Sequence, residues 1–238
     1  MKNNPEVTII VPCLNEAHNA AGYAQTLLAP LAQALPSFEV IFSDGGSSDG
    51  TVDLLWQLSG SYPGVTALAG GRYTFRASLE RAVAEARGEF ILFMEADLSF
   101  NPADAAALLA EIKNSGFDCV CGSPFLGAFE NLPLHRRALT AAANTLLRLR
   151  FGRHLTSYTQ IFKMYRAEKL KTLSFDTEGF ALDAELLVKF LKKGWKVSEI
   201  PVTMRGRSGG ASKMAIARET ANYLRLMLRS CGKAPSRH

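Results

Sequence analysis

Short, almost wholly apolar runs alternate with amphipathic stretches through the first half of the chain. The apolar runs lie at 7–11, 40–43, 65–68 and 90–94, and helical patterns lie between them at 20–35, 51–58 and 78–86. Strands that are apolar at every position are typical of a parallel sheet covered by helices on both faces. The first half therefore predicts an α/β fold with a mostly parallel central sheet.

The second half has a different pattern. Helices are predicted at 134–150, 182–193 and 214–228, and strands at 160–165 and 196–202. No linker rich in Pro, Gly or Ser divides the 238 residues, so we expect one domain over 1–231 and a basic tail at 232–238. The last helix is expected to gather its apolar residues on one side. These residues are Ile216, Tyr223, Leu224, Met227 and Leu228.

Composition and charge narrow the class of protein. No apolar run approaches the roughly 20 residues that span a bilayer, and no signal-peptide pattern opens the chain, so we expect a cytoplasmic protein. The four cysteines form no CxxC pair and are expected to be reduced. The net charge is +5, and Lys and Arg collect at 135–153 and 205–237, which favours an anionic partner. No aromatic-basic motif accompanies this charge, so nucleic acid is not expected.

Polar clusters follow three of the apolar runs, where ligands of parallel sheets bind. Asn15-Glu16 follows the first run, Asp44 to Thr51 the second, and Glu95-Ala96-Asp97 the fourth. Two carboxylates at a strand end could join a divalent cation to a diphosphate. The alternative is that Glu95 and Asp97 cap the helix that opens near Pro102. We assign Gly45-Gly46 and Asp49-Gly50-Thr51 mainly to a tight turn and a helix start.

Three ordered segments carry a resemblance to a known family. Val7 to Glu16, Asp44 to Thr51 and Phe93 to Leu98 resemble the family 2 glycosyltransferases. Gly179-Phe180 with Asp183, and Ile200-Pro201-Val202 followed by Arg207 to Lys213, are similar to the dolichol-phosphate or polyprenyl-phosphate mannose synthase branch. The resemblance implies a GT-A fold, with a nucleotide-sugar half at 1–100 and an acceptor half at 101–231.

The resemblance also implies roles for individual residues. It places the donor nucleotide and sugar against Pro12, Asn15, Glu16, Asp44, Arg72, Glu95, Ala96 and Asp97. It makes Glu95 and Asp97 the ligands of Mg²⁺ or Mn²⁺, and it makes Arg207, Ser212 and Lys213 the phosphate and acceptor grip on a glycine-rich loop. A solvent-facing arginine is the alternative for Arg72, and a solvated basic loop is the alternative for 205–213.

The sequence departs from the family pattern at three places. Asp44-Gly45 stands where the family has two aspartates, and Glu95 and Ser99 replace an Asp and a Gln at the metal motif. Segment 157–163 lacks the glycine of a Ser-Gly-Phe-Arg-like run, which bears on the sugar and acceptor pocket.

Asp183 is the candidate general base, because in the wider family an acid near this place deprotonates a hydroxyl acceptor. A phosphate acceptor is already anionic and needs no base, so Asp183 would then position substrate. Glu185 is expected to be an acid of the first helical turn.

These residues predict a metal-dependent, inverting glycosyltransferase in which Asp97, Asp183 and Arg207 are catalytic. The donor is GDP-mannose or a UDP-hexose, and the acceptor is a polyprenyl phosphate at the cytoplasmic membrane face. Peripheral attachment to an anionic membrane would use two basic helical segments. Their basic residues are His135, Arg136, Arg137, Arg148, Arg150 and Arg153, and Arg218, Arg225 and Arg229. The alternatives are a soluble family 2 transferase acting on a small-molecule, glycan or protein hydroxyl, and a non-catalytic nucleotide-sugar binding module.

Overall fold

The computed structural model describes residues 4–152, 154–206 and 216–229. Its strands are β1 (Val7–Cys13), β2 (Phe38–Asp44), β3 (Val65–Leu68), β4 (Phe90–Phe93), β5 (Cys119–Glu130), β6 (Lys163–Arg166) and β7 (Val197–Arg205). Its α-helices are α1 (Ala17–Ala20), α2 (Ala29–Ala34), α3 (Thr51–Ser61), α4 (Phe75–Glu85), α5 (Ala105–Asn114), α6 (Leu134–Phe151), α7 (Ala167–Leu170), α8 (Ala181–Lys192) and α9 (Ile216–Arg229).

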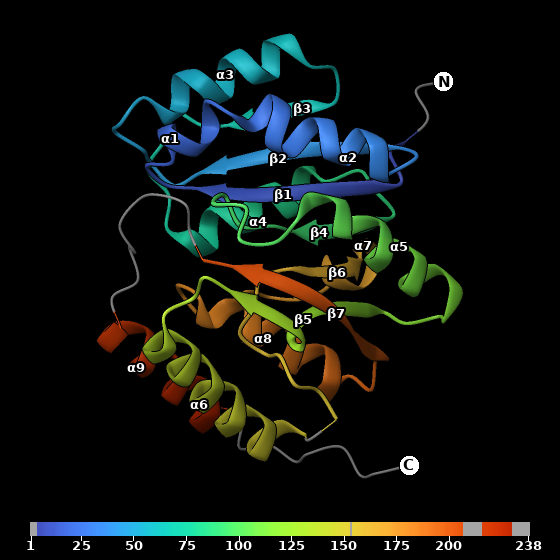
Figure 1. Ribbon diagram of the computed structural model, residues 1–238, viewed down its shortest axis with the longest axis vertical. Helices are drawn as coiled ribbons and strands as arrows, with labels where there is room; N and C mark the ends of the chain where they lie inside the picture. The colour runs from blue at the N-terminus through green and yellow to red at the C-terminus, as the bar shows by residue number, and fades with distance from the viewer. Residues whose placement is uncertain (1–3, 153, 207–215, 230–238) are drawn as a thin grey trace.

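The strands form one sheet in the order β3-β2-β1-β4-β6-β5-β7. Figure 1 shows it running from β3 at the top to β5 and β7 at the bottom, with α6 and α9 at the lower left. Strand β6 is antiparallel to β4 and β5, and the other pairs are parallel. The predicted mostly parallel sheet is confirmed.

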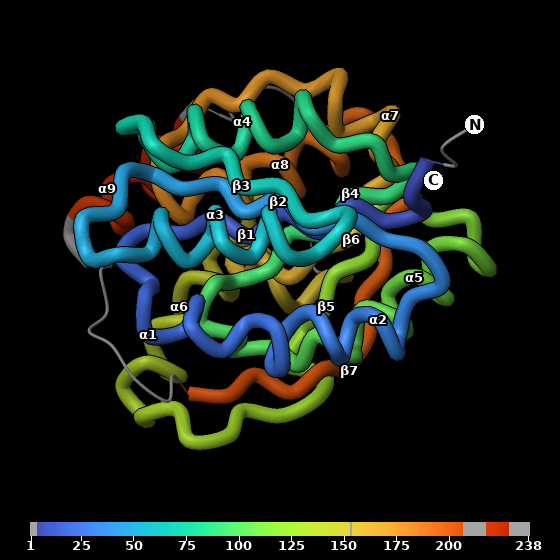
Figure 2. Tube along the Cα trace, turned by 90° about the horizontal axis from the view of Figure 1, so that it is seen from above, coloured from blue at the N-terminus to red at the C-terminus, as the bar shows by residue number. Residues whose placement is uncertain are grey.

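Helices cover both faces of the sheet, and successive residues of β1 point into different cores. Ile9 and Val11 belong to a core that includes residues of α2, α3 and α5. Ile10 belongs to a second core that includes residues of α4, α6, α8 and α9. In Figure 2, α2 and α4 lie on opposite sides of the strands. This two-sided burial explains why the strands read as continuous apolar runs.

The predicted helix at 20–35 is confirmed over 23–34, but it is not one regular α-helix. Helix α1 ends at Ala20, a π-helical segment η1 follows at Ala24–Leu28, and α2 begins at Ala29. Pro30 occupies the first turn of α2 and has no N–H to donate to the preceding turn, so a regular α-helix cannot pass through it. The pattern of apolar positions did not show this break.

Helices α6, α8 and α9 and strands β6 and β7 lie close to the predicted ranges. None of the helices in the described ranges is long and apolar enough to cross a bilayer. The predicted basic tail, 232–238, lies outside the described residues.

Candidate active site

Three polar segments leave the sheet at the same edge. Strand β1 is parallel to β2 and to β4, with Cys13 opposite Asp44 and Ile10 opposite Phe93. The residues after these strands therefore emerge side by side, as the sequence predicts. Pro12 lies opposite Ser43 in the same register, one step inside the edge. Neighbouring strands lie about 4.8 Å apart, so one nucleotide diphosphate can reach all three segments.

Asp44 is fully buried and organises the turn after β2. Its Oδ2 accepts hydrogen bonds from the N–H groups of Gly46 and Ser47 at 2.8 and 3.0 Å, and its Oδ1 accepts from the Ser47 hydroxyl. Gly46 has φ +107°, a left-handed value that favours glycine. Asp44 thus has a structural function in the turn, and base binding by this residue stays a prediction.

Asn15 and Glu16 tie the segment after β1 to the segment after β2. The Asn15 N–H donates to Ser47 Oγ at 2.7 Å, and Asn15 Oδ1 accepts from the Ser48 N–H at 2.8 Å. The Glu16 N–H donates to Thr51 Oγ1 at 2.8 Å. Asn15 has φ +51°, which Asn tolerates better than most residues. The two segments therefore form one rigid polar edge.

The start of α3 is capped as the sequence predicts. Asp49 Oδ1 accepts from the N–H and the hydroxyl of Thr51 at 3.1 and 2.5 Å, and Gly50 has φ +90°. Burial opposes ionisation of Asp49, but the hydrogen bonds from Thr51 and from the Ala17 N–H outweigh it and lower its pKa. Asp49 is therefore a structural carboxylate.

Arg72 lies beside the same turn. A Cβ added at Gly46 would stand 3.1 Å from Arg72 Cγ, and the Tyr73 N–H donates to Gly45 O at 3.3 Å. The Arg72 side chain is exposed. Arg72 therefore lies at the polar edge formed by the segments after β1, β2 and β4, which we call the donor edge. Its contact with phosphate stays a prediction.

The segment Glu95-Ala96-Asp97 is anchored by the buried Tyr23, which the sequence did not identify. The buried Tyr23 hydroxyl donates to Ala96 O at 2.6 Å, and its ring stacks on Phe42 with centroids 5.2 Å apart. Burial raises the pKa of this hydroxyl well above its usual value, and the Cys13 and Glu16 side chains raise it further. Tyr23 therefore remains a donor. Nothing in the local pattern distinguishes it from an ordinary core tyrosine.

The two carboxylates of this segment do not cap a helix. The 3₁₀ turn η2 (Pro102–Asp104) is capped by Asn101, whose side chain accepts from the Ala103 N–H at 3.2 Å. Asp97 Oδ1 instead accepts from the N–H and hydroxyl of Ser99 at 3.0 and 2.6 Å. Glu95 and Asp97 are partly exposed at the edge. The capping alternative is therefore wrong.

A divalent cation fits this pair only together with further ligands. The described residues contain no group of three or more His, Cys, Asp or Glu side chains that could hold a metal ion. Mg²⁺ and Mn²⁺ prefer oxygen ligands, and Mg²⁺ is commonly bound by one or two carboxylates together with substrate phosphates. Glu95 and Asp97 match that donor set.

Asp183 lies in the first turn of α8 and is 1% exposed. Neither of its carboxylate oxygens has a hydrogen-bond partner among the described residues. Burial raises its pKa to about 7, the buried Lys163 opposes that rise, and Glu219 of α9 adds to it. In this conformation Asp183 cannot contact a substrate, so its role as a base is untested.

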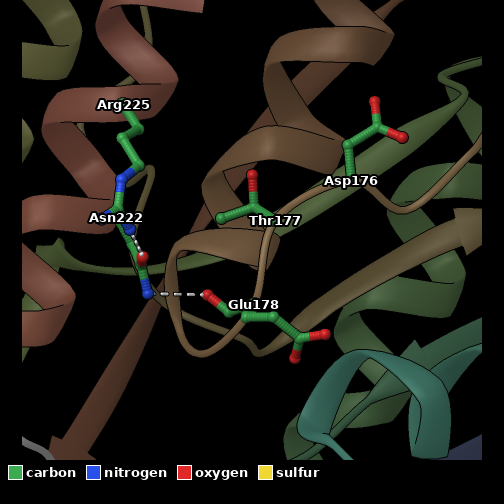
Figure 3. A pocket seen from close by; sticks show the side chains of 5 residues that line it. All are labelled: Asp176, Thr177, Glu178, Asn222 and Arg225. Atoms are coloured by element: carbon green, nitrogen blue, oxygen red, sulfur yellow. Dashed lines mark hydrogen bonds between the residues drawn. The ribbon is translucent and has the colours of Figure 1, made fainter.

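Helix α9 forms hydrogen bonds with residues 178 and 180, in the segment that precedes α8. Glu219 Oε2 accepts from the Phe180 N–H at 2.9 Å, and Asn222 Nδ2 donates to Glu178 O at 2.9 Å. A small pocket lies between α9 and the segment before α8 (Figure 3). It is lined by Asp176, Thr177, Glu178, Asn222 and Arg225.

The prediction for Glu185 is wrong. Glu185 is buried in α8, where it forms an ion pair with Lys189 and accepts from the Asp176 N–H at 3.0 Å, so it anchors the preceding segment instead of acting as an acid of the first turn.

The predicted apolar side of α9 is confirmed only in part. Tyr223 and Met227 pack against the second core, whereas Leu224 and Leu228 are exposed. Glu219 and Asn222 are buried, because they form hydrogen bonds with the segment before α8.

Arg207, Ser212 and Lys213, which are predicted to contact phosphate, lie outside the described residues. The chain leads to them from Arg205, whose N–H donates to Ser99 O at 2.7 Å. The Arg205 side chain binds Glu130 at 3.0 Å. The end of β7 is thus joined to the segment that follows Glu95 and Asp97.

Comparisons with known proteins agree with this arrangement. A model of glycosyl transferase family 2 matches residues 8–174. An undecaprenyl-phosphate mannosyltransferase of Micrococcus luteus is 28% identical over 223 residues, covering 88% of this chain and 87% of that protein. A polyprenol monophosphomannose synthase of Mycolicibacterium smegmatis is 28% identical over 219 residues, covering 87% and 80%.

A solved structure confirms the predicted GT-A fold. Glucosyl-3-phosphoglycerate synthase from Mycobacterium tuberculosis, in complex with Mn²⁺, UDP and glucosyl-3-phosphoglycerate, superposes with a TM-score of 0.73 at 17% identity. The match covers 98% of this chain and 81% of that one. With the family model spanning most of the sheet and the whole polar edge, the chain belongs to glycosyl transferase family 2.

Proposed function

We propose that this protein is an inverting transferase that moves a sugar from GDP-mannose or a UDP-hexose to a polyprenyl phosphate. The observation that carries the proposal is the carboxylate pair Glu95 and Asp97, which caps no helix and stands at the strand edge shared with the β1 and β2 segments. The relatives named for undecaprenyl-phosphate and polyprenol-phosphate mannose support the acceptor.

Glu95 and Asp97 would hold Mg²⁺ or Mn²⁺ on the donor diphosphate. The structural neighbour crystallised with Mn²⁺ and UDP supports this assignment. When bound, the ion neutralises charge that develops on the leaving diphosphate. Asn15, Glu16 and Asp44 would bind the nucleotide at the donor edge. Their hydrogen bonds already fix this edge, so donor binding would cost less conformational entropy. Arg72, Arg207, Ser212 and Lys213 would contact phosphates.

A phosphate acceptor agrees with the burial of Asp183. A hydroxyl acceptor needs a base in contact with it, whereas a phosphate is already ionised at neutral pH. Because the Asp183 carboxylate is 1% exposed, we assign it a structural or positioning function under the proposed reaction. A soluble transferase acting on a hydroxyl would need Asp183 uncovered, and loss of all transfer in Asp183→Asn would favour that alternative.

Helix α6 would provide peripheral attachment to the cytoplasmic membrane face. Leu134, Leu139, Leu146 and Leu149 are 78%, 43%, 52% and 61% exposed. His135, Arg136 and Arg137 are exposed on the same helix. Apolar side chains together with arginines are typical of helices that lie in an anionic bilayer surface.

Vesicle flotation tests this attachment. The protein should float with vesicles that contain an anionic phospholipid at low salt, and the double variant Leu146→Ser/Leu149→Ser should bind about tenfold more weakly, because two apolar side chains no longer leave water. Thr145→Ser is the matched control on the same helix. Equal flotation of all three proteins would exclude α6 as the contact.

The reaction is tested with a panel of GDP- and UDP-sugars, Mg²⁺ or Mn²⁺, and a short-chain polyprenyl phosphate. Released nucleoside diphosphate and lipid-linked sugar are followed separately. Lipid-linked product that disappears with EDTA is the expected result. Metal-dependent donor hydrolysis without lipid product would keep the transferase and move the acceptor to a hydroxyl. Donor binding without turnover would leave a binding module.

A further inference from the structure

Helix α6 is attached to the rest of the protein by a narrow buried stripe. Of its 18 residues, only Asn144 and Leu147 are buried. Leu147 lies in the core that α8 also lines. Asn144 is 2% exposed, although burying an amide without hydrogen-bond partners is unfavourable. A polar residue at one of the two buried positions therefore requires an explanation beyond packing.

The Asn144 amide fixes the backbone of the segment before β6. Its Oδ1 accepts from the N–H groups of Tyr158 and Thr159 at 2.6 and 3.3 Å. Its Nδ2 donates to Thr159 Oγ1 at 2.9 Å and to Thr140 O, within α6, at 2.8 Å. These bonds use both donors of the amide and both lone pairs of its oxygen. One side chain thus sets the distance between α6 and residues 158–159.

The segment held in this way leads to the edge that carries the metal motif. Lys163 opens β6 and lies opposite Phe93, two residues before Glu95. Because β6 is antiparallel to β4, its first residue is at the edge where β4 ends. The buried Lys163 ammonium donates to the carbonyls of Tyr158 and Gln160. A displacement at residue 158 would therefore act on Lys163, the residue at which β6 begins.

The other side of the segment is also fixed. Glu199 of β7 accepts from the N–H groups of Thr156 and Ser157, both at 2.6 Å. Asn144 is thus the connection of this segment to α6, and Glu199 is its connection to the sheet. These two residues hold the beginning of the segment 157–163, which lacks the family glycine.

We propose that Asn144 is a positioning residue for the acceptor: it holds residues 156–160 so that a polyprenyl phosphate lying along α6 presents its phosphate to the donor at Glu95 and Asp97. This inference rests on the proposed acceptor. The nucleotide would bind the segments after β1 and β2, which lie on the other side of β4 from β6. We therefore expect Asn144 to affect transfer to the lipid and not binding of the donor.

The test separates lipid transfer from donor hydrolysis in the full-length protein. In Asn144→Ala, transfer to a short-chain polyprenyl phosphate should fall at least about tenfold in kcat/KM for the lipid, because misplacement of about 1 Å can cost about a hundredfold. Metal-dependent donor hydrolysis and the donor KM should stay within about twofold. Thr145→Ala, on the exposed side of the same helix, is the matched control and should resemble the wild type.

A milder pair of variants keeps the test decisive if Asn144→Ala does not fold. Thr159→Val removes one of the bonds to Asn144 and should show the same split between transfer and hydrolysis, about threefold in size. Thr159→Ser restores the hydroxyl and should restore transfer. Unchanged transfer in both Asn144→Ala and Thr159→Val, or an equal fall of transfer and hydrolysis, would overturn the inference. A wild-type enzyme that hydrolyses donor without making lipid-linked sugar would instead overturn the acceptor on which it rests.

Discussion

The donor edge and the acceptor half differ at one buried carboxylate and at one exposed helix. At the donor edge, backbone N–H groups donate to the side chains of Asp44, Asn15 and Asp49. The Tyr23 hydroxyl donates to the Ala96 carbonyl, between Glu95 and Asp97. In the acceptor half, both oxygens of the buried Asp183 lack hydrogen-bond partners among the described residues, and leucines of α6 face water. The contrast teaches that hydrogen bonds within the protein already order the donor edge, whereas the acceptor half keeps a buried carboxylate and exposed leucines that are costly in the free protein.

The largest effect is expected at the donor edge. Asp97→Asn keeps the shape of the side chain and its bond from the Ser99 N–H but removes the charge that would hold the metal. We expect kcat for metal-dependent donor turnover to fall by about 10³-fold or more. Asp53→Asn, at an exposed carboxylate of α3, is the control. Substantial turnover in Asp97→Asn would end the metal assignment.

A pH-dependent effect is expected in the acceptor half. The pKa of Asp183 is raised to about 7 by burial, so the folded protein binds a proton there that the unfolded chain releases near its ordinary pKa of 3.8. The stabilisation from this proton is complete below about pH 4 and is lost as the pH rises through about 7. The free energy of unfolding should therefore fall by at most about 4 kcal/mol over this range.

Urea unfolding at pH 5 and pH 8 measures this effect. In Asp183→Asn the amide cannot ionise, so that part of the pH dependence should be absent, and the variant should gain on the wild type as the pH rises. Asp53→Asn serves as the control for a change of charge at the surface. Parallel pH profiles of wild type and Asp183→Asn would mean that Asp183 is ionised or solvated in the folded protein.

A smaller effect is expected from the support beneath the metal motif. Tyr23→Phe leaves the buried Ala96 carbonyl without its 2.6 Å bond and should lower the free energy of unfolding by about 1–2 kcal/mol. The metal-site segment should loosen, so half-maximal turnover should need about threefold more Mn²⁺. Tyr62→Phe, at an exposed tyrosine, is the control. An unchanged Mn²⁺ requirement would show that Tyr23 contributes stability alone.

The smallest effect is expected at Arg205. Its ion pair with Glu130 is exposed on both sides, so Arg205→Gln should cost less than about 1 kcal/mol of stability. The donor KM should stay within about twofold. A donor KM raised more than about fivefold would place Arg205 on a substrate phosphate.

Most of the donor edge could be predicted from the sequence, and less of the acceptor half could. The apolar runs located four strands, and the polar residues that follow them identified the edge, because both depend on short-range periodicity. The break between α1 and α2, the inward-facing Glu219 and Asn222, and the ion pair of Glu185 were not predicted. Each depends on partners distant in the sequence or on backbone hydrogen bonding that the apolar pattern does not report.

The sequence by itself determined the family, the mostly parallel sheet and the identity of the edge residues, since strand order of this kind brings the carboxyl ends of parallel strands together. Only the tertiary structure decided which of those residues hold the protein together. In the structure, Asp44 and Asn15 hold a turn together through hydrogen bonds, and Asn101, not Glu95 or Asp97, caps the following turn. Asp183 is buried. The structure also revealed Tyr23 and Asn144, because a residue's partners across a fold depend on packing between segments that no local pattern encodes.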